Sequence, residues 1–194
     1  MKRLFDFITS FIGILVFSPI LIIVYLLVKL SSVGPAFFVQ KRIGKNGQIF
    51  QMIKFRSMTV IQNSNSTISV KGDIRVTKIG VFLRKFKLDE LPELWNVLKG
   101  DMSLVGPRPD VCGYADNLIG EDRKILELRP GITGLASLKY YDEEDVLASQ
   151  DNPLKFNDEV IYPDKVRLNL DYYYNNNLWI DIKIIFATIF RVNY

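Results

Sequence analysis

The sequence predicts a mainly helical α+β protein with an N-terminal re-entrant membrane helix hairpin, a small β-hairpin and amphipathic surface helices. Three observations predict this class. No charged residue occurs between Asp6 and Lys29, two β-rich runs flank a turn at residues 44–47, and several later segments have the spacing of amphipathic helices. At 194 residues the chain suits one domain with a core. We therefore expect a membrane helix at residues 1–32 and a single globular unit at residues 33–194.

The composition limits the available chemistry. The chain has 25 Lys and Arg against 21 Asp and Glu, a net charge of +4 that suits an anionic surface or a phosphate ligand and is small for a nucleic-acid-binding protein. Without histidine, acid, base or nucleophile chemistry must come mainly from Asp, Glu, Lys, Tyr or hydroxyl groups. The single cysteine, Cys112, excludes an intrachain disulfide, and we expect it to be a small buried side chain.

The N-terminal apolar segment has three interpretations. At ~1.5 Å per residue it would just cross a bilayer core of about 30 Å as a straight helix. A cleaved signal peptide is not expected, because the run is too long and no small-residue cleavage site follows it. Both flanks are basic, with Lys2 and Arg3 before the segment and Lys29 at its end. Because positive flanks stay in the cytoplasm, both ends are expected on one side of the membrane.

A bend in this segment would allow that arrangement. Pro19 lies near its middle, lacks an N–H group and clashes with the carbonyl of Leu15. Ser18 can bond to a carbonyl freed in this way, which matters where water is absent. We therefore favour a re-entrant hairpin that enters and leaves one leaflet through a Ser18–Pro19 break. A kinked span and a buried core helix remain as alternatives.

The rest of the chain contains further recognisable elements. Residues 36–55 predict a β-hairpin, because Asn46-Gly47 is a strong turn signal. Residues 60–72 are rich in Asn, Ser and Thr and predict a mobile loop, a linker or a lid. Thr77 can cap a basic amphipathic helix running to about Phe86, suited to a membrane surface or to packing on the core. We also expect helices at residues 111–128 and 155–175 and an amphipathic or docking helix at 179–191.

Two adjacent carboxylates, Asp89 and Glu90, are the strongest candidates for chemistry. Pro92 is compatible with the first turn of a helix, so the pattern predicts a helix from about Asp89 to Lys99 that ends at Gly100. Carboxylates at a helix start are favoured in the ionised form. They suit Mg²⁺ binding or nucleophilic attack on phosphorus. Taken alone, such a pair is most often ordinary helix capping.

Attack on a phosphoanhydride also requires cations that neutralise its oxygens. Several basic residues lie nearby in the sequence motifs: Lys54, Arg56, Arg75, Arg84 and Arg108. Arg108 lies between Pro107 and Pro109, so its backbone is stiff. Each of these side chains alone is equally compatible with a solvated surface charge.

The ordered set of motifs resembles the bacterial sugar transferase family, the small monotopic polyprenyl-phosphate phosphoglycosyltransferases. The matching stretches are residues 2–6, 18–19, 34–40, 42–44, 54–58, 75–80, 83–84, 88–109 and 130–134. They follow one another in one order, so the resemblance is highly specific. Two positions depart from the common pattern: Asp110 stands where Glu is frequent and Ser137 where Gln is frequent.

The resemblance implies transfer of a sugar-1-phosphate from a UDP-sugar to undecaprenyl phosphate, with release of UMP. The product, a lipid-diphosphate-sugar, initiates surface polysaccharide or glycoconjugate synthesis. By the same resemblance Asp89 is the nucleophile that forms a phosphosugar intermediate, and Glu90 helps to hold Mg²⁺. The expected phosphate-binding residues are Lys54, Arg84 and Arg108, with Arg56 and Arg75 behind them.

The resemblance also implies a location and partners. The catalytic unit would lie on the cytoplasmic face of the bacterial inner membrane and contact one leaflet, with no nucleic-acid partner and with a homo-oligomer left open. A metal-dependent glycosyltransferase that releases UDP would usually carry Asp-x-Asp, and the nearest match here is residues 142–145. A non-catalytic monotopic scaffold of a polysaccharide assembly complex is the alternative function. The sugar cannot be read from the sequence.

Overall fold

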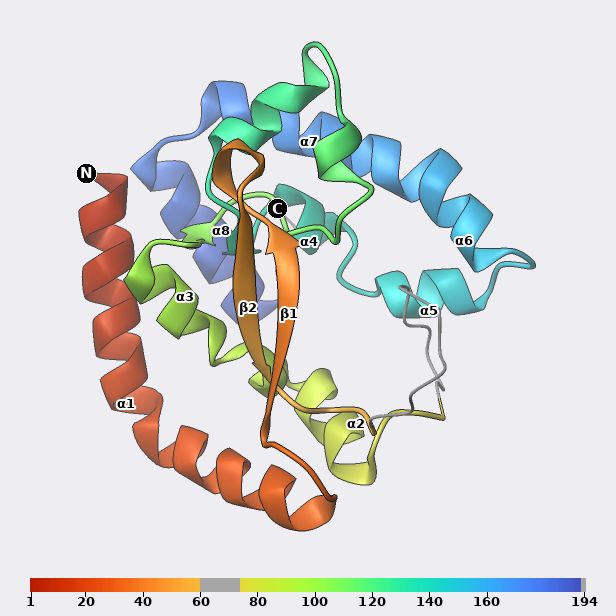
Figure 1. The fold of residues 1–194 in the computed structure, drawn as a ribbon. Coiled ribbons are helices and arrows are strands. Elements are labelled where there is room, and N and C mark those ends of the chain that lie inside the picture. Colours follow the sequence, from red (N-terminus) through yellow and green to blue (C-terminus); the bar gives the residue numbers. More distant parts are fainter. Residues whose placement is uncertain (60–73, 193–194) are drawn as a thin grey trace.

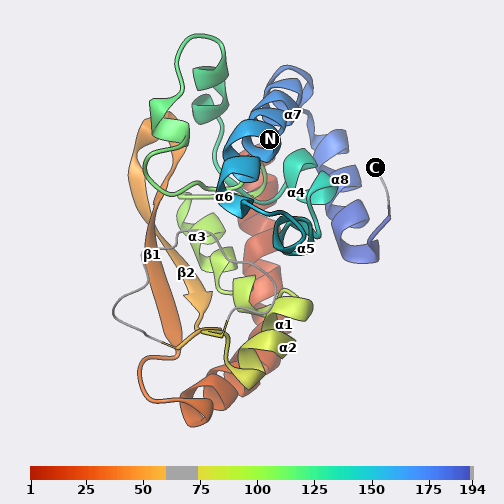
Figure 2. The same cartoon turned by 90° about the vertical axis from the view of Figure 1, so that its right-hand side faces the viewer.

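A computed structural model describes residues 1–59 and 74–192, and the protein is mainly helical with two small sheets (Figure 1). The polar loop expected at residues 60–72 lies outside the described residues. The hairpin of β1 (Phe37–Ile43) and β2 (Ile49–Phe55) stands on one side of the molecule and α8 (Leu178–Phe190) on the other, with α3 (Glu93–Lys99) between them (Figure 2).

The apolar segment forms one helix, α1 (Lys2–Ser31), with Pro19 inside it. The helix bends about halfway along and continues beneath the rest of the molecule (Figure 1). Proline cannot donate to the carbonyl four residues earlier, that of Leu15, and the Ser18 hydroxyl donates to this carbonyl at 2.8 Å. The hydrogen bond expected of Ser18 is therefore present. The segment is a single bent helix here, and its path in a bilayer is taken up under the proposed function.

The N-terminal end of α1 is fastened to the globular part. The ammonium of Lys2 pairs with Asp181 at 2.5 Å. Arg3 donates to the carbonyls of Val97 at 2.5 Å and Leu98 at 2.8 Å. These carbonyls belong to the last turn of α3 (Glu93–Lys99), where helical carbonyls lack partners within the helix.

Asp6, one turn further along α1, is buried and makes the next attachment. Its carboxylate accepts hydrogen bonds from the Ser103 hydroxyl at 2.9 Å and from the Leu104 amide at 3.1 Å. Both donors belong to the short strand β3 (Ser103–Val105), so the first turns of α1 are joined to the core by buried polar bonds.

The predicted β-hairpin is confirmed. Strand β1 (Phe37–Ile43) pairs antiparallel with β2 (Ile49–Phe55), with Phe37 opposite Phe55 and Ile43 opposite Ile49. The turn contains Asn46 with φ 57° and Gly47 with φ 76°, the left-handed conformations that an Asn-Gly pair accepts. The hairpin brings Lys54 beside α3.

The cap on α2 (Lys78–Lys85) is also confirmed, because the Thr77 hydroxyl accepts from the Gly80 amide at 2.9 Å. The predicted helix start at Asp89 is wrong. Residues Leu88–Glu90 form a 3₁₀ turn, and α3 runs from Glu93 to Lys99 and is capped by Gly100, whose φ is 98°. Because Pro92 has no N–H to donate, the α-helical hydrogen bonding begins only after it.

The helix expected at residues 111–128 is not present. That segment contains 3₁₀ turns at Ala115–Asn117 and Asp122–Glu127. Gly113 and Gly120 interrupt it with φ values of 102° and 58°, which a helix does not contain. The expectation that Cys112 is buried is also wrong: it lies exposed in this irregular stretch, beside Gly113.

The C-terminal part of the described chain contains five α-helices, of which the first two were not expected from the sequence. The five helices are α4 (Leu135–Lys139), α5 (Glu143–Ala148), α6 (Pro153–Phe156), α7 (Tyr162–Asn175) and α8 (Leu178–Phe190). A π-helical turn, Asn157–Ile161, joins α6 to α7. The segment expected to be helical at residues 155–175 is therefore confirmed with a local irregularity, and the final helix is confirmed.

A second sheet positions Arg108. Strand β3 pairs parallel with β4 (Gly131–Thr133). The glycines Gly106 and Gly131 let the backbones approach closely, since a Cβ on Gly131 would lie 2.1 Å from the Gly106 nitrogen. The chain leaves β3 through Gly106 and Pro107 and so presents Arg108 to the 3₁₀ turn that carries the carboxylate pair.

Candidate active site

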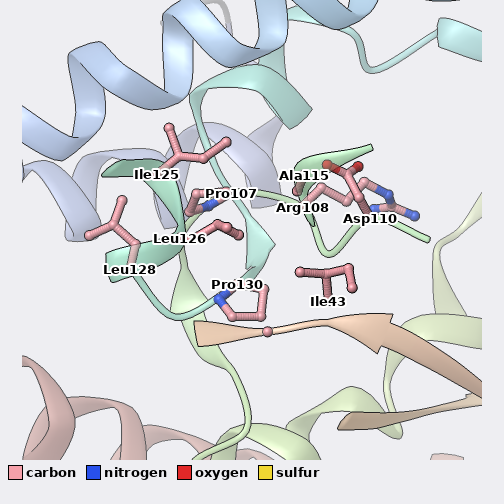
Figure 3. A pocket seen from close by; sticks show the side chains of 10 residues that line it. Ile43, Pro107, Arg108, Asp110, Ala115, Ile125, Leu126, Leu128 and Pro130 are labelled. Carbon is pink, nitrogen blue, oxygen red and sulfur yellow. The ribbon is translucent and has the colours of Figure 1, made fainter. Parts of the chain in front are cut away.

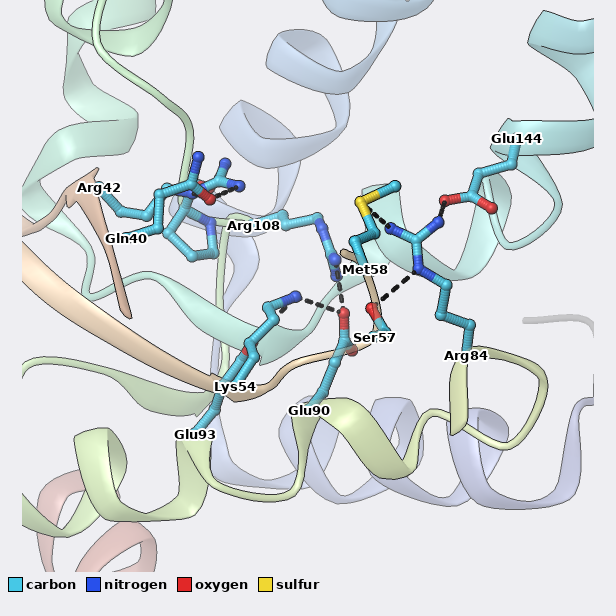
Figure 4. A network of polar contacts seen from close by, with 11 residues as sticks. Gln40, Arg42, Lys54, Ser57, Met58, Arg84, Glu90, Glu93, Arg108 and Glu144 are labelled. Atoms are coloured by element: carbon cyan, nitrogen blue, oxygen red, sulfur yellow. Dashed lines mark hydrogen bonds and ion pairs between the residues drawn. The ribbon is translucent and has the colours of Figure 1, made fainter. Parts of the chain in front are cut away.

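Glu90 is the centre of the candidate site. One of its carboxylate oxygens, Oε1, lies 2.8 Å from Lys54 Nζ and 2.6 Å from an Arg108 guanidinium nitrogen (Figure 4). The three side chains come from β2, from the 3₁₀ turn and from the loop after β3. The structure thus brings together three residues that the sequence analysis selected from separate motifs.

Asp89 lies next to this cluster and is only 7% exposed. Its Oδ1 atom is buried and has no hydrogen-bond partner in the part of the chain that the structure describes. Burial, followed by the negative charge of Glu90, raises the pKa of Asp89 above its ordinary value. A buried carboxylate oxygen without a partner is costly, which favours a functional role for this atom.

Glu93 is a member of the cluster that the sequence analysis missed. Its side chain is almost fully buried, and its Oε1 lies 3.1 Å from Lys54 Nζ, within ion-pair distance but without hydrogen-bond geometry. The available signal was its spacing of one helical turn from Glu90. Because a glutamate after Pro92 also suits the first turn of a helix, that spacing alone did not single it out.

The charges of the cluster are strongly coupled. Burial alone would raise the pKa of Glu90, but the positive charges of Arg108 and Lys54 outweigh it and hold that pKa well below its usual range. In return, Glu90 raises the pKa of Arg108. Burial raises the pKa of Glu93 to about 7. At neutral pH Glu90 is therefore ionised, whereas Glu93 is close to its midpoint.

Arg84 lies at the edge of the site. From α2 its guanidinium donates to the Ser57 hydroxyl at 3.2 Å and pairs with Glu144 at 3.1 Å (Figure 4). The carbonyl of Arg75 accepts a hydrogen bond from the Thr59 amide at 2.8 Å, which joins the described segments that end at residue 59 and begin at residue 74.

Arg56 lies outside the cluster. Its buried guanidinium donates to the carbonyls of Ser32 at 2.8 Å and Val33 at 2.9 Å. It also reaches the carbonyl of Val28 at 3.4 Å, so this arginine closes the C-terminal end of α1. The structure therefore gives Arg56 a structural place beside the apolar helix.

A second polar group adjoins Arg108. Arg42 donates to the Pro109 carbonyl at 3.0 Å, and burial raises the pKa of Asp110 to about 6. Behind Arg108 and Asp110 lies a small cavity with mostly apolar walls (Figure 3). Arg42 was not among the candidates from the sequence, because its tight link to the Pro107–Pro109 turn is a tertiary contact.

Asp89 and Glu90 are oxygen donors whose chemistry is compatible with magnesium. Magnesium prefers oxygen ligands, commonly one or two carboxylates together with waters and substrate phosphates. Asp89 supplies a buried oxygen without a partner, and Glu90 lies beside it. Within residues 1–59 and 74–192 no group of three or more His, Cys, Asp or Glu side chains converges on a metal-sized site. A two-carboxylate donor set is therefore the one that this site offers.

The fold and the site together define a class of protein: one long apolar N-terminal helix packed against a globular part whose buried carboxylates are surrounded by cations. Among the described residues, α1 is the one helix long and apolar enough to cross a membrane. A model of the bacterial sugar transferase family matches residues 1–193, and the chain belongs to this family.

The chain is similar in sequence over nearly its whole length to several bacterial proteins. The chain is 40% identical over 195 residues to a UDP-glucose:undecaprenyl-phosphate glucose-1-phosphate transferase of Klebsiella pneumoniae, covering 98% of this chain and 39% of that protein. It is 38% identical to a UDP-N-acetylgalactosamine-undecaprenyl-phosphate N-acetylgalactosaminephosphotransferase of Aeromonas hydrophila, covering 97% and 42%. It is 39% identical to the exopolysaccharide production protein PSS of Rhizobium leguminosarum bv. phaseoli, covering 97% and 93%. The chain thus spans less than half of the first two relatives.

Proposed function

We propose that this chain transfers a sugar-1-phosphate from a UDP-sugar to undecaprenyl phosphate, releasing UMP and forming a lipid-diphosphate-sugar. This would be the initiating step of surface polysaccharide or glycoconjugate synthesis. The observation that carries the proposal is the buried, unpartnered oxygen of Asp89 beside the Glu90 cluster. The names of the Klebsiella and Aeromonas relatives supply the substrate classes.

The proposed reaction has two displacements at one phosphorus. Asp89 Oδ1 attacks the phosphorus that bears the sugar, and the bond from that phosphorus to the UMP oxygen breaks. UMP leaves and a phosphosugar–Asp89 acyl phosphate remains. An oxygen of undecaprenyl phosphate then attacks the same phosphorus, and the bond to Asp89 breaks. The Asp89 carboxylate is regenerated, so the enzyme ends as it began.

The cations around Glu90 support this chemistry. Lys54 and Arg108 point to a common carboxylate oxygen and can neutralise the diphosphate of the donor, with Arg84 at the edge of the site. Asp89 and Glu90 would hold Mg²⁺, which when bound neutralises phosphate charge as a Lewis acid. Glu90 is suited to this role because its pKa is held low and it stays ionised.

We also propose that α1 enters and leaves the same leaflet. Lys2 and Arg3 hold one end of the helix and Arg56 holds the other, all through contacts with the globular part. A straight span would place these ends about 30 Å apart on opposite sides of the hydrocarbon core. Both attachments instead lie on one body, and the bend at Pro19 makes this possible.

Further exposed apolar side chains support contact with a membrane surface. Helix α8 exposes Trp179, Phe186 and Phe190, α2 exposes Phe82, and Phe86 is exposed directly after α2. The C-terminal ends of the two helices are linked where Arg191 donates to the carbonyl of Lys85 at 3.2 Å. Aromatic side chains beside basic ones suit an anionic lipid surface. Residues 1–32 would then form the membrane segment, and residues 33–194 the catalytic unit on the cytoplasmic face of the bacterial inner membrane.

Nucleotide release tests the reaction. The purified full chain in lipid discs is incubated with Mg²⁺, undecaprenyl phosphate and a panel of UDP-sugars, beside Asp89→Asn and a Cys112→Ser control. UMP release with one donor, lost in Asp89→Asn and kept in Cys112→Ser, supports the proposal. Release of UDP would overturn it, and no release across the panel would favour a scaffold.

A second assay addresses the intermediate. The protein is incubated with the active UDP-sugar and Mg²⁺ but without the lipid acceptor, quenched with acid and digested. A phosphosugar adduct on the peptide that contains Asp89, absent in Asp89→Asn and discharged by undecaprenyl phosphate, supports the two-step scheme. UMP release that strictly requires both substrates would contradict it and favour direct transfer.

A further inference from the structure

Lys54 is held by two carboxylates from different places in the fold. Its ammonium lies 2.8 Å from Glu90 Oε1 and 3.1 Å from Glu93 Oε1. Glu90 also binds Arg108 and lies beside Asp89, whereas Glu93 is almost fully buried behind Lys54. The two anchors therefore differ in their surroundings: Glu90 adjoins Arg108 and Asp89, and its side chain is 10% exposed against 3% for Glu93.

The backbone around this pair is fixed by one buried side chain. Asn96 on α3 accepts from the Ile53 amide at 3.1 Å and donates to the Gln51 carbonyl at 2.7 Å. Ile53 precedes Lys54 on β2, and Asn96 lies one helical turn after Glu93. These bonds fix strand β2 against helix α3 in one register. This register places Glu93 beside Lys54.

We propose that Glu93 is a positioning residue that holds the ammonium of Lys54 at the reacting centre; this rests on the proposed function. A lysine carries its charge on a flexible four-carbon stem, so one anchor leaves it several orientations. When phosphate oxygens compete for Arg108 and Lys54, the contact with Glu90 is the one disturbed. Glu93 is out of reach of the substrate and keeps Lys54 in place through turnover.

The protonation of Glu93 should then affect the rate. Burial raises the pKa of Glu93 to about 7, with Lys54 opposing this shift and the charge of Glu90 adding to it. The groups that face it are Lys54 on β2, Glu90 on the 3₁₀ turn, Arg108 after β3 and Arg42 on β1. The ionised form attracts Lys54 more strongly than the neutral form. Turnover should therefore rise as the pH rises through about 7.

A double-mutant cycle tests the proposal with Glu93→Gln, Lys54→Met and the combination, and Glu121→Gln as a surface control. We expect Glu93→Gln to lower kcat about tenfold to a hundredfold, with a smaller effect on the donor KM. In the Lys54→Met background the same substitution should have no further effect. The rise near pH 7 should be lost in Glu93→Gln. An equal loss in both backgrounds would overturn the proposal.

A measurement without turnover separates this proposal from the proposed function. Competitive acylation followed by mass spectrometry reports how readily the Lys54 amine reacts, and it requires no substrate. Faster acylation of Lys54 in Glu93→Gln, with Lys183 unchanged as an internal reference, supports the anchoring. Unchanged acylation of Lys54 overturns it. Absence of UMP release by the unsubstituted protein would overturn only the proposed reaction.

Discussion

Arg56 donates to the carbonyl of Ser32 at 2.8 Å and thereby joins the end of the β-hairpin to the end of the apolar helix. Strand β2 ends at Phe55, so Lys54 and Arg56 belong to different surroundings although they are two residues apart. Lys54 contacts the carboxylates of the site, whereas Arg56 satisfies carbonyls at the C-terminus of α1. Two cations from one sequence motif therefore have different tasks.

The first prediction concerns Arg56. Arg56→Met should lower the thermal unfolding midpoint, because the carbonyls of Ser32 and Val33 lose the buried guanidinium that donates to them. A hydrogen bond to a charged group contributes roughly 1.5–3 kcal/mol. The activity per folded molecule should change little. Differential scanning fluorimetry in detergent measures the first effect, and UMP release the second. A stable variant that is inactive would instead give Arg56 a place in phosphate binding.

The second prediction concerns Arg108. Arg108→Met should reduce kcat/KM for the UDP-sugar by roughly 10²–10³-fold, the usual cost of removing a donor that stabilises transition-state charge. Lys155→Met removes a surface cation whose ion pair with Glu159 is a long contact of 3.9 Å, and it serves as the matched control. UMP release under saturating lipid acceptor measures both. Equal activity of the two variants would argue against a phosphate role for Arg108.

The third prediction concerns pH and stability. Glu titrates near ~4.3 in an unfolded chain, while burial raises the pKa of Glu93 in the fold to about 7. Between these pH values Glu93 is largely protonated in the folded protein and ionised in the unfolded chain. The folded state therefore binds more protons, and its stability falls as the pH rises through this window. Glu93→Gln removes this titrating group. The unfolding midpoint of the variant should therefore decline less between these pH values than that of the unsubstituted protein. Burial raises the pKa of Asp110 to about 6, so this residue also makes the stability of both proteins fall as the pH rises. Thermal melts with EDTA, compared at each pH, measure the difference.

The fourth prediction concerns the path of α1 through the membrane. Cys112 is exposed on the globular part and provides a reference for labelling from that side. In a Cys112→Ser background, a cysteine inserted after Met1 and one at the exposed position Lys41 should react from the same face as Cys112. A membrane-impermeant maleimide, added to sealed inverted or right-side-out vesicles, distinguishes the faces. Labelling of the two positions from opposite faces would falsify the re-entrant path.

Much of the fold followed from local signals. The β-hairpin was predictable because Asn-Gly fixes its turn, and α2 because Thr77 caps it. The irregular segment around Cys112 was not, because its hydrophobic spacing suits a helix while Gly113 and Gly120 adopt conformations that end one. The start of α3 was misplaced because proline tolerates both a first helical turn and the position before it.

The candidate site was partly predictable for a different reason. Asp89, Glu90 and Arg108 lie in one continuous motif, and Lys54 lies in another, so the resemblance could bring them together. The contacts of Arg56 with α1 and of Glu93 with Lys54 depend on the packing of distant elements. No spacing in the chain encodes those contacts. They required the register between β2 and α3 that Asn96 fixes.

The attachment of Asp6 to β3 and of Lys2 to Asp181 has a practical consequence for protein engineering. Deleting the apolar helix would remove the cation that pairs with the buried Asp181 carboxylate and the acceptor of the Leu104 amide. The helix is therefore part of the folded unit. A truncation of the helix that is intended to make the protein water-soluble should instead give a protein that aggregates or is degraded by proteases. A soluble variant would instead keep both ends of the helix and replace its outward-facing aliphatic side chains with polar ones.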